Sequence, residues 1–215
     1  MYPDQVNLPN LKRLIEEFIH EQHHPGSNAC DIPNLPHFYE RITIHTAAVA
    51  TFHVPSDLSG IGGMRCERIH AVDRWRNGPG CYDTLFINIT EDGADDSDLS
   101  AHGFLGLNVA HAHLFFSFNL DGVKYPCVLV QWFSHLTDTP SEVTGMYIVE
   151  PKCVNGEPVT AVVHLDTVFR AAHLLPVFSN GPPLRRHWWH EQTLDLFNKF
   201  FVNQYIDYHA FEVVT

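Results

Sequence analysis

The sequence predicts a mainly β protein, a small curved antiparallel barrel flanked by an N-terminal and a C-terminal helix. Three observations predict this fold. Short apolar, β-branched runs follow one another closely through the middle of the chain, turn-forming residues separate them, and amphipathic stretches stand near both ends. The chain has 215 residues, of which 45% are hydrophobic, and this is enough for one core.

The two terminal helices are read from apolar residues at helical spacing. The first is expected over residues 8–23, and Pro25-Gly26 ends it before a polar linker. The second is expected from Thr193, a candidate N-cap, to about Tyr208. The chain is therefore divided into an N-terminal helix and linker (1–36), a β-barrel domain (37–180), and a C-terminal helical segment that packs on the barrel (181–215).

The clearest strands form a central hairpin. Residues 107–118 are a long apolar run, Asn119-Leu-Asp-Gly122 is a turn, and residues 123–133 return. Asn155-Gly156 marks a second hairpin turn. Further strands are expected over residues 41–54, 64–72, 83–90, 145–150 and 159–165.

The charge balance is acidic, with 13 basic and 25 acidic residues and a net charge of -12. This balance does not favour nucleic acid as the partner, because a protein that coats phosphates presents a basic surface. Five of the carboxylates lie together in Glu91–Asp98, so the rest of the surface is closer to neutral. A local basic patch therefore stays open as an alternative.

Cysteine usage indicates an intracellular protein. The five cysteines are far apart and odd in number, which is typical of reduced thiols and not of a disulfide framework. Residues 1–10 are polar and do not resemble a signal peptide, and no apolar run approaches about 20 residues, the length that spans a bilayer. We expect a nuclear or cytoplasmic protein that is not secreted and has no membrane partner.

One histidine motif matches H-E-x-x-H, the zinc motif of metalloproteases, at His20-Glu-Gln-His-His24. On a helix, however, His20 and His24 fall nearly opposite the apolar face, toward solvent, and Pro25 disfavours helical geometry at His24. A solvated helix end is the preferred interpretation.

A second histidine pair, His111-Ala-His113, lies in an expected strand, so both imidazoles point to one face. With His102 or His135 the pair could build a three-histidine metal site, but the glutamate that accompanies an H-x-H strand in cupin-like proteins is missing. The sequence therefore predicts no metal, no other cofactor and no catalytic residues. A metal-dependent enzyme that uses one of the two histidine clusters remains the alternative.

The aromatic-basic stretch Leu184-Arg-Arg-His-Trp-Trp-His190 suits recognition of a peptide or a nucleic-acid strand. Its tryptophans could instead staple the final helix onto the barrel. A DNA-binding alternative would use Arg185 and Arg186 together with Arg65. The predicted binding residues are Trp132, Tyr147, Arg185, Arg186, Trp188 and Trp189.

Several longer segments carry a resemblance that extends from about Leu8 to Glu212. They are Pro55-Ser-Asp-Leu-Ser-Gly-Ile-Gly-Gly-Met-Arg65, Tyr82-Asp-Thr-Leu-Phe-Ile87, Leu114-Phe-Phe-Ser-Phe118, Tyr125-Pro-Cys-Val-Leu-Val-Gln-Trp-Phe133, Thr144-Gly-Met-Tyr-Ile-Val-Glu-Pro151, His164-Leu-Asp-Thr-Val-Phe-Arg-Ala-Ala-His-Leu-Leu-Pro-Val177 and Phe201-Val-Asn-Gln-Tyr-Ile-Asp-Tyr-His209. Through them the chain resembles the C-terminal region of transposase-like proteins of basidiomycete fungi, of the Plavaka and Kyakuja-Dileera-Zisupton type.

The resemblance implies a non-catalytic accessory module derived from a DNA transposon, because this region follows the catalytic part in such proteins. Its expected role is to bind a protein or chromatin partner. The end of the barrel is also similar, more loosely, to chromatin-reading BAH domains, which implies a barrel of BAH or SH3-like character. That second similarity is an analogy of fold, and fold alone does not fix function.

Overall fold

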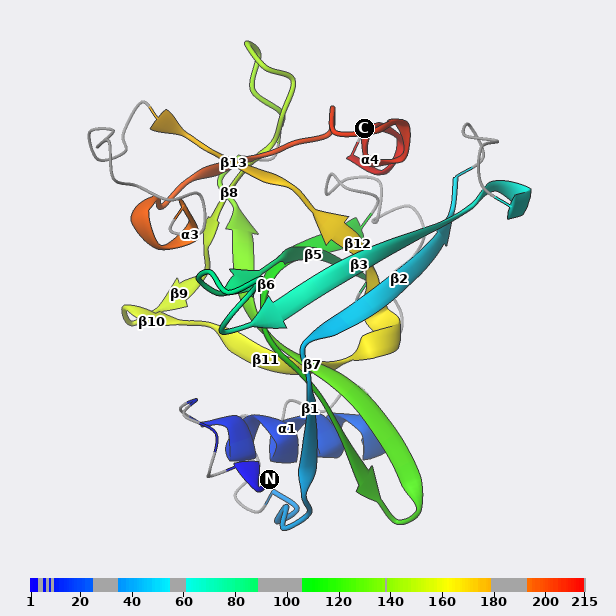
Figure 1. Ribbon diagram of the computed structural model, residues 1–215. Coiled ribbons are helices and arrows are strands. Elements are labelled where there is room, and N and C mark those ends of the chain that lie inside the picture. Colours follow the sequence, from blue (N-terminus) through cyan, green and yellow to red (C-terminus); the bar gives the residue numbers. More distant parts are fainter. Residues whose placement is uncertain are drawn as a thin grey trace.

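The structure is a computed structural model that describes residues 1–3, 6, 8, 10–24, 35–54, 61–88, 106–137, 139–178 and 193–214. Antiparallel strands form a small, curved and nearly closed barrel with helices at both ends of the chain (Figure 1). The fold class expected from the sequence is thereby confirmed. No helix in the described part of the chain is long and apolar enough to cross a membrane.

The main sheet is antiparallel throughout. Its strands, in spatial order, are β12 (Val168–Ala172), β5 (Thr84–Asn88), β6 (Leu107–Leu120), β7 (Val123–His135), β8 (Ile148–Pro151), β14 (Phe200–Val202) and β13 (Leu174–Pro176). Two further strands pair with the central hairpin, β1 (Ile42–His45) with β6 and β11 (Thr160–His164) with β7. Two small sheets complete the strands: β2 (Ala47–His53), β3 (Met64–Val72) and β4 (Cys81–Tyr82) in one, and β9 (Cys153–Val154) and β10 (Glu157–Pro158) in the other.

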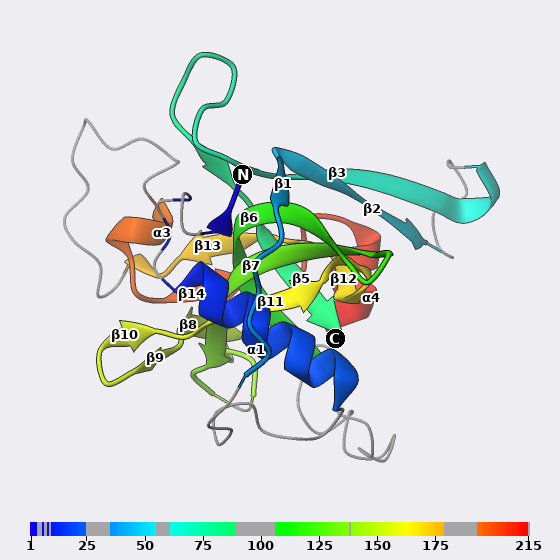
Figure 2. The ribbon, with the colours of Figure 1, turned by 90° about the horizontal axis from the view of Figure 1, so that it is seen from below.

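The helices are α1 (Leu11–His23), α3 (Thr193–Leu196) and α4 (Tyr208–Val214), with 3-10 turns η3 (Ile61–Gly63) and η5 (Leu165–Thr167). Helix α1 crosses the outside of the barrel over β7 and β11 (Figure 2). It buries its apolar face there, as its spacing predicts, and Glu16 accepts a hydrogen bond from the amide of Phe38 at 2.9 Å. This bond fixes the chain that leads into β1.

A β-bulge in β6 explains how one hairpin serves three groups of buried side chains. Before the bulge, Ala110 and Ala112 face the barrel interior, whereas after it Phe115 faces the interior and Leu114 faces outward. The extra residue therefore reverses which side chains point inward. The outward face packs on α1 beyond the bulge and on the C-terminal elements before it.

The C-terminal segment differs from the sequence expectation. The single helix expected from Thr193 to about Tyr208 is wrong, because α3 ends at Leu196 and β14 follows at Phe200–Val202. Strand β14 pairs with β8 and β13 and buries Phe200 and Val202 completely, so sheet pairing outweighs the helical spacing of the sequence. A second helix, α4, then begins after Asp207.

Candidate functional site

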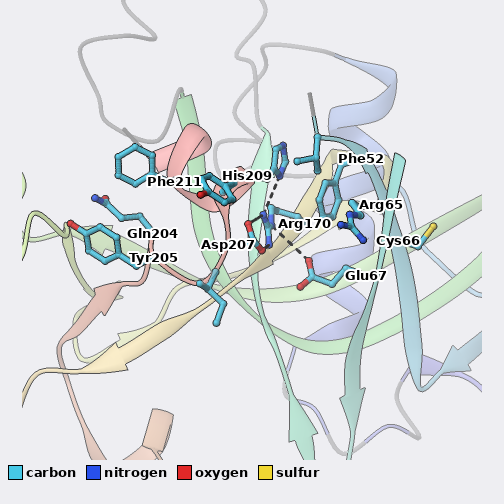
Figure 3. A pocket seen from close by; sticks show the side chains of 13 residues that line it. Phe52, Arg65, Cys66, Glu67, Arg170, Gln204, Tyr205, Asp207, His209 and Phe211 are labelled. Carbon is cyan, nitrogen blue, oxygen red and sulfur yellow. Dashed lines mark hydrogen bonds and ion pairs between the residues drawn. The ribbon is translucent and has the colours of Figure 1, made fainter. Parts of the chain in front are cut away.

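A pocket of about 820 Å³ lies between the β2–β3 hairpin and the C-terminal segment around α4 (Figure 3). Its walls come from segments more than a hundred residues apart in the sequence. The lining residues from the barrel are Phe52, Val54, Arg65, Cys66, Glu67 and Arg170. Those from the C-terminal segment are Gln204, Tyr205, Ile206, Asp207, Tyr208, His209 and Phe211.

The floor of the pocket is organised by Arg170, which projects from β12 and is only 1% exposed. Its Nη1 and Nη2 atoms donate to the two carboxylate oxygens of Asp207, at 2.9 and 2.7 Å. A bidentate pair of this kind fixes orientation as well as charge. The hydrogen bonds from Arg170 lower the pKa of Asp207 from 3.8 to about 2.

Glu67 on β3 provides a second carboxylate beside Arg170. Its Oε2 atom accepts a hydrogen bond from the amide of Ala171 at 3.1 Å and lies 3.7 Å from Nε of Arg170. Burial opposes ionisation of Glu67, but the hydrogen bond from His173 and the charge of Arg170 outweigh it, so its pKa is lowered. Two carboxylates therefore hold one buried guanidinium in place.

His209 completes the floor from α4. Its ring stacks on Phe52 with centroids 4.7 Å apart and planes at 8°, and the Arg170 guanidinium lies 4.8 Å from the same Phe52 ring. Nδ1 of His209 lies 3.0 Å from Nη1 of Arg170. Because a guanidinium only donates, this nitrogen accepts and the ring proton lies on Nε2. Burial, followed by the positive charge of Arg170, lowers the pKa of His209 and favours the neutral ring.

The rim of the pocket is apolar and open to solvent. Four large side chains of the C-terminal segment are exposed there: Tyr205, Ile206, Tyr208 and Phe211. Tyr208 is 77% exposed. Tyr205 is positioned by its hydroxyl, which donates to the carbonyl of Thr144 at 3.0 Å, and its ring lies 6.2 Å from that of Phe211. Exposed aromatic groups around a charged, rigid floor are typical of a recognition site.

The two predicted binding residues that the structure describes, Trp132 and Tyr147, do not line this pocket. Trp132 on β7 packs against the buried cluster inside the barrel, and Tyr147, just before β8, packs against the outer cluster near the C-terminal strands. Their binding role stays a prediction. Arg185, Arg186, Trp188 and Trp189 lie outside the described residues. Arg65, which the DNA-binding alternative included, does line the pocket.

The main pocket residues were missed because no local motif marks them. One signal was available in the apolar run Val168-Phe-Arg-Ala-Ala172, where a single arginine interrupts an otherwise apolar strand. Buried arginines are almost always paired, so this position pointed to a distant carboxylate. The partner, Asp207, follows 37 residues later.

The two histidine motifs occupy separate surfaces. His20 and His24 stack at the end of α1 with ring centroids 4.6 Å apart. His111 and His113 lie on the outward side of β6, also 4.6 Å apart, and His113 contacts Oε1 of Gln131 at 3.2 Å. Burial, and then the neighbouring charge of His113, lowers the pKa of His111 to about 4.

A different trio has the geometry of metal ligands. Among the described residues, ligand atoms of His70, Cys81 and Asp83 all lie within 4.8 Å of one another. All three residues are half-buried, so solvent can reach the group. No spacing motif in the sequence marks this trio.

Comparison with protein-family models, with curated proteins and with solved structures finds no match for this chain.

Proposed function

We propose that this chain is a non-catalytic interaction module, derived from a DNA transposon, that binds a short segment of a protein partner in the pocket between β2–β3 and α4. The resemblance of the segments described above supports the transposon origin. The proposal includes a nuclear or cytoplasmic location and a partner that is associated with chromatin. One observation carries the binding role. Tyr205, Tyr208 and Phe211 expose aromatic surface at the edge of a preorganised pocket.

The chemistry of the pocket favours a peptide with an apolar anchor. Asp207 and Glu67 together outweigh the charge of Arg170 by one, and Arg65 on the pocket wall offsets the difference, so the pocket offers little net charge to an ionic ligand. The exposed rings offer area that a buried aromatic or aliphatic side chain would cover. Tyrosine is enriched among binding hot spots because it gives large contact area at small entropic cost.

Rigid support also favours binding over chemistry. The floor is held by a bidentate ion pair and a ring stack, and Tyr205 is tied to the loop that contains Thr144. A surface that is already ordered pays less conformational entropy when a partner docks.

A peptide library displayed on phage, selected against the purified chain, tests the proposal. Peptides that enrich are synthesised, and their affinity is measured by fluorescence polarisation against wild type and Tyr208→Ala. We expect a loss of about tenfold or more for the variant, in line with a hot-spot residue. Tyr39→Ala is the matched control, since Tyr39 is also exposed but lies outside the pocket and is expected to leave affinity unchanged.

Two outcomes would overturn the proposal. Equal affinities for wild type and both Tyr208→Ala and Phe211→Ala would place the binding surface elsewhere. Binding to mixed-sequence duplex DNA with a steep loss at higher salt, unaffected by either variant, would favour the DNA-binding alternative.

A further inference from the structure

We propose that His70, Cys81 and Asp83 bind one zinc ion, at a site separate from the peptide pocket. This inference does not depend on the proposed function. The three residues come from the end of β3, from β4 and from the connection into β5. The proposal departs from the sequence-based prediction of no metal, which was argued from the motifs at His20–His24 and His111–His113.

The pairing of β3 with β4 brings the three side chains to one face. Val72 pairs with Cys81, and continuing this register places His70 opposite Asp83. The amide of Asp83 donates to the carbonyl of His70 at 2.9 Å, in agreement with that placement. Since Cys81 and Asp83 are two residues apart, their side chains lie on the same side of the strand. The backbone therefore fixes the ligand arrangement.

The three side chains are close enough to share one ion. Nδ1 of His70 lies 3.2 Å from Oδ2 of Asp83, and Sγ of Cys81 lies 3.7 Å from the other carboxylate oxygen, Oδ1. One ligand atom from each residue lies within 4.8 Å of the other two. With ordinary zinc–ligand bonds of about 2.1 Å to nitrogen or oxygen and about 2.3 Å to sulfur, the edges of the tetrahedron are about 3.4 Å and about 3.6 Å. The separations between the ligand atoms, which are at most 4.8 Å, would shorten toward these edges as the side chains close around the ion, and a water can complete the fourth position.

The donor set selects the metal. A thiolate with an imidazole and a carboxylate suits zinc, whereas magnesium and calcium prefer oxygen ligands alone. Binding would release the thiol proton of Cys81 to solvent, whereas neutral His70 would bind through Nδ1 and keep its single ring proton on Nε2.

The surroundings of His70 also fit ligation. Its Nε2 atom is buried and makes no hydrogen bond within the described part of the chain. When Nδ1 binds a metal the proton moves to Nε2, and the ring packs against Trp75 with centroids 4.1 Å apart. An N–H beside an indole face is a weak favourable contact, whereas a bare ring nitrogen there has none. The loop that carries Trp75 is closed by hydrogen bonds from Trp75 to Pro79 and from Gly78 to Trp75.

Zinc here would tie β4 and the start of β5 to β3. Because β3 also carries Arg65 and Glu67 into the pocket, the ion would stiffen one wall of that pocket from the opposite end of the strand.

Metal analysis of the untagged chain tests the site. The protein is purified without chelator, dialysed against zinc and passed through a desalting column before the measurement. Elemental mass spectrometry should find about one zinc ion per wild-type chain. The Cys81→Ser and His70→Gln variants should each lose most of this zinc. Cys153→Ser is the matched control, because Cys153 is an exposed cysteine on β9, and it should retain the ion. His20→Gln with His24→Gln removes the surface histidine pair and should also retain it.

Cobalt substitution gives a readout that does not rely on the variants folding. Cobalt bound by Cys81 should produce a thiolate charge-transfer band and the intense visible bands of tetrahedral cobalt in the wild type. Two results would overturn the proposal. One is that reconstituted wild type holds less than about a tenth of an equivalent of zinc, and the other is that Cys81→Ser retains all of its zinc. Loss of the metal only in the His20 and His24 variant would also overturn it, and would identify the end of α1 as the site.

Discussion

The guanidinium of Arg170 on β12 donates to both carboxylate oxygens of Asp207, and the same carboxylate accepts the amide of Ala210 at 2.7 Å. Asp207 therefore caps α4 while it neutralises a charge buried in the barrel wall. The helix that bears part of the aromatic rim is attached to the barrel at this point. Several predictions about stability depend on this attachment.

Replacing Asp207 with asparagine keeps a capping group but removes its charge. Because Arg170 would then be buried with only the more distant Glu67 as counter-ion, while the Asp207 side is partly screened by solvent, we expect the free energy of unfolding to fall by about 1 to 3 kcal/mol. Urea denaturation followed by circular dichroism measures this change. Glu17→Gln removes the partner of the exposed Arg13 on α1 and should change the same quantity by less than about 0.5 kcal/mol. Equal effects of the two variants would contradict the buried role of the pair.

Low pH should lower the free energy of unfolding of the wild type through protonation of Asp207. The pKa of Asp207 is about 2 when folded and 3.8 ordinarily, so the folded state binds this proton less tightly than the unfolded state. Its stabilising contribution is then complete above about pH 4 and is lost as the pH falls toward about 2. The stability difference between wild type and Asp207→Asn should shrink over that window, and a constant difference would contradict the assignment.

His111 should give a second pH dependence in a higher window. Burial lowers its pKa to about 4 from 6.5, so the unfolded chain takes up the proton first as the pH falls. Stability present above about pH 6.5 is therefore lost progressively down to about pH 4. His111→Asn should make the free energy of unfolding less steep in pH across that range. Parallel curves for wild type and variant would show that His111 titrates normally.

The cysteines should differ sharply in their reactivity. Cys127 is buried, and burial raises the pKa of its thiol to about 12, whereas Cys66 and Cys153 are exposed. Since the thiolate is the reactive form, brief alkylation of the native protein should modify Cys66 and Cys153 and leave Cys127 intact. Peptide mass spectrometry reads the result, and unfolding in urea is the positive control. Rapid labelling of native Cys127 would contradict its placement.

Helix α1 should stabilise the barrel substantially. Ile15 is fully buried between the helix and the outer face of β6, β7 and β11. We expect Ile15→Ala to lower the free energy of unfolding by about 2 to 5 kcal/mol. Arg13→Ala on the exposed side of the same helix is the control. A small effect of both would show that α1 is dispensable for the fold.

The parts of the fold that local patterns determine were predictable. The end of α1 at His23 follows from the sequence, although the helix begins at Leu11 and not at residue 8, and the central hairpin follows from two apolar runs around Asp121-Gly122. The C-terminal helix was mistaken because Leu194, Phe197 and Phe201 recur at helical spacing, whereas Phe200 and Val202 are drawn into a sheet by β8 and β13. Pairing between distant strands is not encoded in a short window of sequence.

The candidate sites could not be predicted either, because they too depend on contacts between distant parts of the sequence. Arg170 and Asp207 meet across 37 residues, and Glu67 reaches them from β3, so neither proximity nor spacing in the sequence marks the pocket. The His70, Cys81 and Asp83 trio depends in the same way on a hairpin register. Trp132 and Tyr147, which the sequence predicts as binding residues, pack against buried clusters, and their binding role stays a prediction.

Because of the bulge at residues 112–114, the chain should tolerate a change of length at some positions of the central hairpin and not at others. Gain of a single codon there would turn every side chain downstream in β6 to the opposite face, moving Phe115 outward and Leu114 and Phe116 into the barrel. A codon added at the Asp121-Gly122 turn would lengthen only an exposed loop tip. Natural variants of this chain should therefore differ in length at the hairpin tip and carry no added residue at the bulge.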